Sequence, residues 1–202
     1  KKAEVATLLG DGSGAFPVQV PCFAAGIVRA VALGDLSGDG LPDAAVATSS
    51  GMTLLENTGD WLPAGPALSP ADMFDVGLED IDLDGDLDVV WCTNVVVGYM
   101  HLEGLAPGGP IGSYASSQIT APLTLAAGDV DGEGLSDLVA AGAGSDRVWV
   151  IHGVGSLGGS ASLVVPVGDA PRAVAIGALN GDGFTDIVTA NELSHDVSIV
   201  YG

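Results

Sequence analysis

The sequence is poor in basic residues. It has 5 Lys and Arg residues against 26 Asp and Glu residues in a chain of 202, which gives a formal net charge of -21. Nucleic acids and anionic membrane surfaces repel such a chain, so neither is expected as a partner. A disordered acidic tail would contain few apolar residues, yet 48% of this chain is hydrophobic. The acidic residues are therefore expected to be concentrated at particular places on a folded protein.

Other scarcities narrow the class further. The sequence has no run of 18 apolar residues, so no membrane-spanning helix is expected. It has two cysteines, Cys22 and Cys92, which lie in apolar segments and are expected to be buried thiols. Helix-favouring Lys and Arg are few, whereas Gly reaches 31 residues. This composition indicates a turn-rich, all-β protein.

Four segments of the sequence align with one another. Each has an alternating apolar run, a nine-residue acidic loop and a second apolar run, and the loops begin at residues 35, 80, 129 and 178. The spacings of 45, 49 and 49 residues are typical of β-propeller blades, each of which is a four-stranded sheet. The second run is nearly all apolar, which predicts a strand buried on both faces between neighbouring blades.

The repeats predict an all-β propeller, or a segment of one, as a single domain over residues 1–202. The expected repeats are about 1–22, 23–69, 70–117, 118–167 and 168–202. They correspond to a leading half blade, three complete four-stranded blades, and a fourth blade without its outer strand. Segment 17–21 is a candidate for that outer strand, which would leave segment 4–9 surplus. Completion by another copy, or by a longer chain, remains the alternative.

Oxygen-bearing side chains recur at positions 1, 3, 5 and 9 of the loops, and position 6 is always glycine. Ca²⁺ takes about six to eight oxygen ligands, and a tight loop of alternating carboxylates can supply them. The glycine permits the bend, and the carbonyl at position 7 adds a ligand. The side-chain candidates are Asp35, Ser37, Asp39, Asp43, Asp80, Asp82, Asp84, Asp88, Asp129, Asp131, Glu133, Asp137, Asn180, Asp182 and Asp186. The carbonyl candidates are those of Leu41, Asp86, Leu135 and Phe184.

Calcium suits these loops better than other cations. They are not EF-hands, because position 12 is never the bidentate Glu of that motif. Magnesium prefers a small octahedral site, and zinc is not expected because the loops contain neither His nor Cys. Three loops are expected to bind Ca²⁺. The fourth is weaker because Ala178 supplies no side-chain ligand at position 1. The alternative is an acidic turn that holds no metal.

The loops, of the form D-x-[DNS]-x-[DE]-G-x-x-D, resemble the FG-GAP/VCBS repeats of integrin-α-like β-propellers over nearly the whole chain. The resemblance implies a β-propeller with Ca²⁺ between the first two strands of its blades. It also implies an extracellular or cell-surface setting, and roles in adhesion, glycan binding or, less often, scaffolding of an enzyme. Ala178 departs from the pattern.

The sequence contains no nucleophile elbow, zinc-protease helix, P-loop or dinucleotide fingerprint. His101, His152 and His195 are interpreted as residues at or beside strand ends, with a metal site shared at one rim as the alternative. The preferred hypothesis is a non-catalytic, calcium-binding module that binds a protein or glycan, mediates adhesion, or assembles with further copies. A polysaccharide-active lyase or hydrolase on the same scaffold is the alternative.

The three tryptophans differ in their surroundings. Trp91 and Trp149 lie in strand-like segments and are expected in the core. Trp61 lies in a loop rich in Gly and Pro, and it is the tryptophan expected to contact a ligand such as a sugar.

Overall fold

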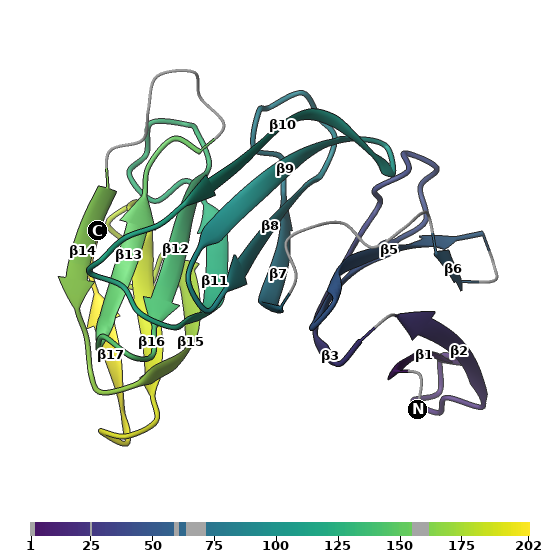
Figure 1. Cartoon of the computed structure of the whole chain (residues 1–202), viewed down its shortest axis with the longest axis horizontal. Helices are drawn as coiled ribbons and strands as arrows, with labels where there is room; N and C mark the ends of the chain where they lie inside the picture. Colours follow the sequence, from purple (N-terminus) through teal and green to yellow (C-terminus); the bar gives the residue numbers. More distant parts are fainter. Residues whose placement is uncertain (1–2, 25, 59–60, 64–71, 155–161) are drawn as a thin grey trace.

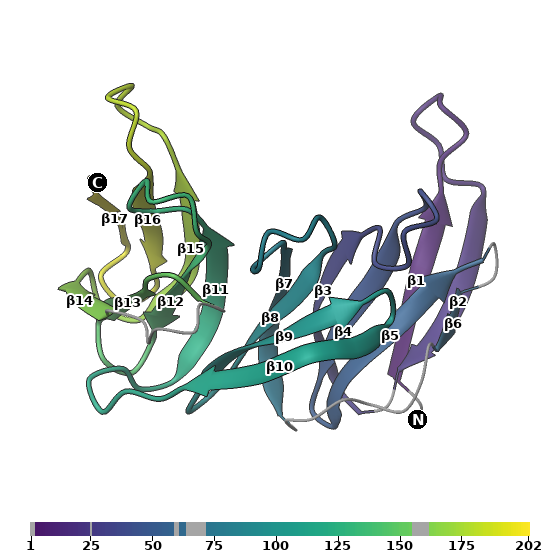
Figure 2. The same cartoon turned by 90° about the horizontal axis from the view of Figure 1, so that it is seen from above.

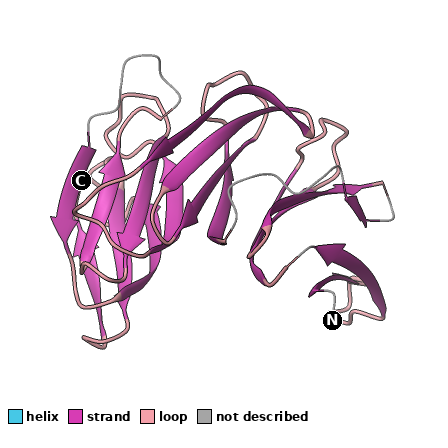
Figure 3. Cartoon of the chain, viewed as in Figure 1, coloured by secondary structure: helices cyan, strands magenta, loops and turns pink. Residues whose placement is uncertain are grey.

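The computed structural model describes residues 3–24, 26–58, 61–63, 72–154 and 162–202. Its sheets follow one another in chain order from the N-terminal end of the molecule to the C-terminal end (Figures 1 and 2). Every regular element in the described ranges is a β-strand, which confirms the all-β prediction (Figure 3). These ranges accordingly contain no helix long and apolar enough to cross a membrane.

Three sheets have four strands each, and we call them blades 1, 2 and 3. Strands that follow one another in the chain are antiparallel neighbours. Blade 1 consists of β3 (Val28–Gly34), β4 (Asp43–Thr48), β5 (Gly51–Asn57) and β6 (Trp61–Pro63). Blade 2 consists of β7 (Met73–Glu79), β8 (Asp88–Thr93), β9 (Val97–Glu103) and β10 (Ala106–Tyr114). Blade 3 consists of β11 (Pro122–Gly128), β12 (Asp137–Gly142), β13 (Arg147–Ile151) and β14 (Ser162–Pro166).

The two remaining sheets are smaller, as predicted. Blade 4 has three strands, β15 (Pro171–Gly177), β16 (Asp186–Asn191) and β17 (Asp196–Val200). The N-terminal sheet has two, β1 (Ala3–Leu9) and β2 (Val18–Ala24). In the described part of the chain β2 pairs with β1, and β17 pairs with β16 alone. The idea that segment 17–21 completes blade 4 is therefore wrong, because adjacent strands joined by a short connection pair with each other.

The core lies between the faces of neighbouring blades. Ala45 and Ala47 of blade 1 pack with Val89 and Trp91 of blade 2, and comparable clusters join blades 2 and 3 and blades 3 and 4. Strands β4, β8 and β12 are buried at every position, which confirms the expected burial on both faces. Strand β16 is buried less completely, because no described sheet covers its second face.

Polar contacts also join the blades near their first strands. The Arg29 guanidinium donates to the Met73 carbonyl at 3.0 Å and to Asp72 Oδ1 at 2.7 Å, and it lies 3.8 Å from the centre of the Phe74 ring. Between blades 2 and 3, the Leu125 N–H donates to Asp75 Oδ2 at 3.0 Å. These contacts hold the first strands of blades 1, 2 and 3 together.

The smaller predictions have mixed outcomes. Cys22 and Cys92 are both buried thiols, and burial raises the pKa of Cys92. Trp91 and Trp149 are in the core, as expected. Trp61 begins β6 instead of lying in a loop, and its side chain is outside the described residues. The expected repeat boundary at residues 69 and 70 also lies outside them.

A substitution at Gly98 tests the packing inside blade 2. A Cβ at this position would lie 2.6 Å from the Trp91 ring and 2.9 Å from the Gly112 carbonyl oxygen. Gly98→Ala is therefore expected to lower the free energy of unfolding by about 2 kcal/mol, as overpacked cores do. Gly177→Ala is the control, because a Cβ there meets nothing within 4 Å. Chemical denaturation of both variants measures the difference, and equal stability would contradict the packing.

Candidate metal centre

Each acidic loop connects the first and second strands of its blade, as predicted. We call residues 35–43, 80–88, 129–137 and 178–186 loops 1 to 4. The glycine at position 6 has a positive φ in every loop, at 87° for Gly40, 98° for Gly85, 82° for Gly134 and 96° for Gly183. Residues other than glycine rarely adopt this backbone conformation, which explains why position 6 is glycine in all four loops.

The aspartate at position 9 is buried in all four loops and attaches each loop to the third strand of its blade. In loop 2, Asp88 Oδ2 accepts from the Ile81 N–H at 3.1 Å, and Oδ1 accepts from the Leu102 N–H at 2.8 Å. The corresponding pair of bonds is formed by Asp43, Asp137 and Asp186. One carboxylate therefore joins position 2 of the loop to the end of the third strand.

The surroundings of this carboxylate differ between blades. Burial raises the pKa of Asp88, although the N–H groups of Leu102 and Ile81 and the ring of His101 act in the opposite direction. At Asp186 the N–H donors of Leu179 and then Gly202 have the larger effect, and the pKa is lowered. In both cases backbone N–H groups stabilise the anion. A carboxylate has about four lone-pair sites, so its oxygens can accept these bonds and still contact a further donor or a cation.

Position 1 organises the turn itself. Asp35 Oδ2 accepts from the Gly40 N–H at 2.8 Å, and Asp80 and Asp129 accept from the glycine of their own loops at 3.0 and 2.9 Å. Ala178 has no carboxylate with which to do this. In loops 1, 2 and 4 the N–H of position 7 donates to the position 5 carboxylate at 2.8 to 2.9 Å.

Loops 1 and 2 have oxygen donors that suit a hard cation. Asp80, Asp82 and Asp84 each offer a carboxylate oxygen, and these three atoms lie within 4.8 Å of one another. In loop 1, the hydroxyl oxygen of Ser37 at position 3 is buried without a hydrogen-bond partner among the described residues. A buried hydroxyl normally has a partner, and a cation inside the loop would provide one. These residues therefore fit Ca²⁺.

Loops 3 and 4 gather fewer of the predicted ligands. In loop 3 the close group contains Asp131 and Asp137, without Asp129 or Glu133. Loop 4 has fewer side-chain oxygens because position 1 is Ala178. One of those oxygens, Asp182 Oδ2, already accepts a hydrogen bond from the Asn180 side-chain amide at 2.7 Å.

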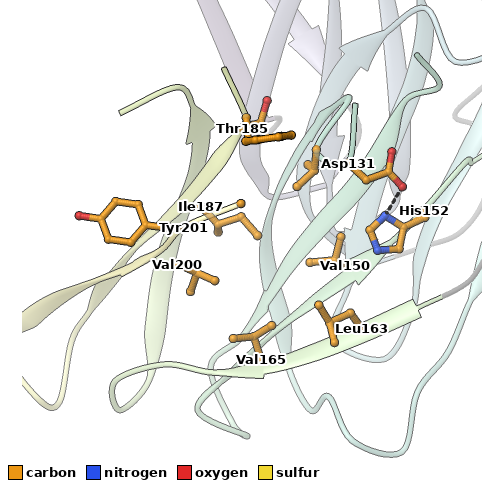
Figure 4. A pocket seen from close by; sticks show the side chains of 12 residues that line it. Asp131, Val150, His152, Leu163, Val165, Thr185, Ile187, Val200 and Tyr201 are labelled. Carbon is orange, nitrogen blue, oxygen red and sulfur yellow. Dashed lines mark ion pairs between the residues drawn. The ribbon is translucent and has the colours of Figure 1, made fainter. Parts of the chain in front are cut away.

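Two histidines approach the loops from the third strands. His101 Nδ1 lies 3.2 Å from Asp82 Oδ2 and 3.1 Å from Asp88 Oδ2. His152 Nδ1 lies 3.0 Å from Asp131 Oδ2 and 3.6 Å from Asp137 Oδ2, and Figure 4 shows the first of these ion pairs. Both residues lie at or beside the ends of third strands, as expected. The loops themselves contain neither His nor Cys, but this does not exclude zinc in the folded chain, because the third strands bring these imidazoles to the loop carboxylates.

The sequence carried one signal of these contacts, which is the matching place of His101 and His152 at the ends of third strands. His195 is elsewhere, since it is an exposed residue in the turn between β16 and β17. The three histidines therefore do not share one rim.

A cavity of about 400 Å³ adjoins His152, between blades 3 and 4. Figure 4 shows Asp131 and His152 at one side of this cavity, with mostly apolar side chains and the hydroxyl-bearing Thr185 and Tyr201 among the others. The apolar lining includes Val150, Leu163 and Val200.

The repeats match a known family. A family model described as an FG-GAP-like repeat matches residues 35–91, 80–140 and 129–189. The chain belongs to the FG-GAP-like repeat family. Each match begins at position 1 of a loop and ends just beyond the next loop, so the family unit runs from loop to loop. The resemblance seen in the loop residues is thereby confirmed.

Solved structures share the fold of this FG-GAP-like chain. A structure of an Agrocybe aegerita lectin that recognises non-reducing terminal N-acetylglucosamine has a TM-score of 0.50 and 21% identity, and the match covers 78% of this chain and 46% of the lectin chain. A crystal structure of BBS1N in complex with ARL6DN, soaked with lead, has a TM-score of 0.56 and 15% identity, with 98% and 62% covered. This chain thus spans 46% and 62% of those two chains. No curated protein matches the sequence.

The structural contributions of the carboxylates at positions 9 and 5 in this FG-GAP-like chain can be compared by mutation. Asp43→Ala removes acceptors from the N–H groups of Leu36, Ser37 and Asn57. In the presence of a chelator it is expected to lower the free energy of unfolding by about 3 kcal/mol, because buried donors lose their partners. Asp39→Ala removes one bond at an exposed turn and is expected to cost about 1 kcal/mol or less. Equal losses in urea denaturation would contradict a structural role for position 9.

Proposed function

We propose that the chain is a non-catalytic, calcium-binding β-propeller module of a secreted or cell-surface protein. The observation that carries this proposal is the group of three carboxylates in loop 2, Asp80, Asp82 and Asp84, at the end of an interior blade. Loops 1, 3 and 4 repeat the sequence pattern of oxygen-bearing residues, with fewer acids in loops 1 and 4. All-oxygen loops of this kind fill readily where Ca²⁺ is abundant, which favours an extracellular setting.

Electrostatics supports the same conclusion. Thirteen of the 26 acidic residues occupy side-chain ligand positions in the four loops. Carboxylates within 4.8 Å of one another repel when no cation lies between them. A cation that binds only the folded loop relieves this repulsion and stabilises the folded state by mass action.

Calcium is therefore expected to raise the melting temperature of the metal-free chain. One site at a hundredfold excess over its dissociation constant contributes about 2.7 kcal/mol. For a chain of this length that corresponds to an increase of roughly 5–10 °C. Scanning calorimetry with Ca²⁺ and with a chelator measures the shift.

Variants of loop 2 refine this experiment. Asp84→Asn is expected to remove one equivalent of bound Ca²⁺ in isothermal titration calorimetry. The matched control is Glu103→Gln, which removes the same charge from an exposed position at the end of β9. Identical melting curves in Ca²⁺ and chelator would overturn the calcium proposal. Equal calcium stoichiometry in Asp84→Asn would overturn the assignment of Asp84.

We further propose that the module acts by binding a protein or a glycan, or by assembly with further copies. One neighbour in fold is described as recognising terminal N-acetylglucosamine, and another is described in a complex with ARL6DN, so the fold is compatible with both classes of partner. Among the described residues, every group of three close acidic or histidine side chains involves a loop carboxylate.

The exposed face of blade 4 supports assembly. Val197 of β17 occupies the place that Met52, Val97 and Val148 occupy in blades 1 to 3, as the strand registers show. Those three side chains are 0% exposed, whereas Val197 is 60% exposed. Ile199 and Tyr201 on the same side of blade 4 are also exposed. An apolar face that is buried in every interior blade is therefore available to another sheet.

The oligomeric state of the purified chain tests this surface. We expect the chain to self-associate, and Val197→Lys to shift it toward the monomer because a charge is then placed in the apolar contact. Leu193→Lys is the control, since Leu193 is exposed in the turn between β16 and β17. Analytical ultracentrifugation gives the native masses. A monomeric parent chain, or a variant that associates equally well, would exclude self-assembly through this face.

A further inference from the structure

We propose that loops 2 and 3 each hold a second kind of metal centre, a mixed nitrogen and oxygen site for a transition-metal divalent cation of the Zn²⁺ class. The ligands in loop 2 are His101, Asp82 and Asp88. The ligands in loop 3 are His152, Asp131 and Asp137. This inference shares with the proposed function only the premise that these loops bind divalent cations, and it assigns them a different ion.

The distances between the donor atoms suit such a centre. Zn²⁺ binds imidazole nitrogen and carboxylate oxygen at about 2.0–2.2 Å in tetrahedral geometry, which places ligand atoms roughly 3.3 Å apart. The separations between Nδ1 and the carboxylate oxygens are 3.1 and 3.2 Å at His101 and 3.0 and 3.6 Å at His152. In both loops the three donor atoms lie within 4.8 Å of one another. One ion can therefore reach all three.

Each histidine Nδ1 faces two carboxylates: His101 Nδ1 forms a hydrogen bond with Asp88 Oδ2 at 3.1 Å and also lies close to Asp82, and one N–H cannot be donated fully to both. The His101 side chain is almost fully buried, and its Nδ1 lies between the Oδ2 atoms of Asp82 and Asp88. His152 Nδ1 is buried, and no contact among the described residues has the geometry of a hydrogen bond to it. A cation bound by Nδ1 and both carboxylates would satisfy all three groups, with the imidazole proton on Nε2.

The third-strand histidine and the aspartate at position 3 occur together in the same blades. The third-strand residue next to the loop is the one before the N–H donor to position 9, and it is Glu56, His101, His152 and Tyr201 in blades 1 to 4. At this third-strand position, histidine occurs only in blades 2 and 3, where position 3 of the loop is Asp. Position 3 of loops 1 and 4 is neutral, Ser37 or Asn180. The third-strand residue and position 3 of the loop, which are far apart in the sequence, thus vary together from blade to blade.

The donor chemistry then separates two classes of site. Carboxylate, hydroxyl and carbonyl oxygens suit Ca²⁺, whereas imidazole nitrogen suits Zn²⁺ and its neighbours in the first transition series. Loop 1 offers oxygen alone. Loop 2 offers both sets, and Asp82 belongs to each of them, so the two cations compete there. In loop 3 the close group is the one that contains His152.

The experiment titrates the metal-free 202-residue chain with Zn²⁺, with Co²⁺ as a spectroscopic probe for nitrogen coordination. The variants are His101→Gln, His152→Gln and both together, and the control is His195→Gln, which removes an exposed histidine away from the loops. We expect two equivalents of Zn²⁺ in the parent chain and in the control. Each single variant loses one equivalent or binds it roughly tenfold or more weakly, and the double variant loses both together with the Co²⁺ spectrum.

Glutamine is used because its amide can still donate to Asp88 and keep the loop folded, and the melting temperature in chelator checks this. A parent chain that binds no Zn²⁺ would overturn the inference, because the histidines would then be ion-paired residues only. A double variant that retains both equivalents would overturn it as well. If Ca²⁺ stabilises the chain but Zn²⁺ does not bind, the proposed function holds and this inference is overturned. If Zn²⁺ binds but Ca²⁺ does not stabilise the chain, this inference is supported and the calcium proposal is overturned.

Discussion

The buried aspartate at position 9 is the group on which the geometry of each blade depends. Its two oxygens join the start of the acidic loop to the end of the third strand, as in Asp88 with Ile81 and Leu102. This connection aligns three strands at one end of the sheet and closes the turn between the first two. It also brings the third-strand residue beside the loop, so the close approach of His101 to Asp82 follows from a structural hydrogen bond.

The second constraint is that the blades bury their faces against each other. An interior second strand is apolar on both faces, because each face meets another sheet. Most charged groups consequently lie in loops and near strand ends, and the net charge of -21 is concentrated there in a chain that is otherwise largely apolar. Core packing and cation binding are thus two results of the same repeated pattern, and the apolar face of blade 4 shows what that pattern leaves uncovered.

Much of the fold was predictable because its signals are local. The spacing of the loops predicted the blades, the alternating and continuous apolar runs predicted the first and second strands, and the invariant glycines predicted the bends that Gly40 and Gly85 form with positive φ. Pairing of β2 was not predictable in the same way. Segment 17–21 has strand character in either arrangement, and only the hairpin with β1 decided its partner.

The sequence by itself determined the repeat, the all-β blades, the family and the oxygen-rich loops, because each depends on short local patterns and on their regular recurrence along the chain. Only the tertiary structure decided which side chains meet across strands. His152 lies outside loop 3 in the chain, yet its Nδ1 is 3.0 Å from Asp131, because antiparallel pairing returns the third strand to the start of the second. Donor sets made by strands that pair in space cannot be read from spacing within a loop, and that is why the imidazoles emerged only in the folded chain.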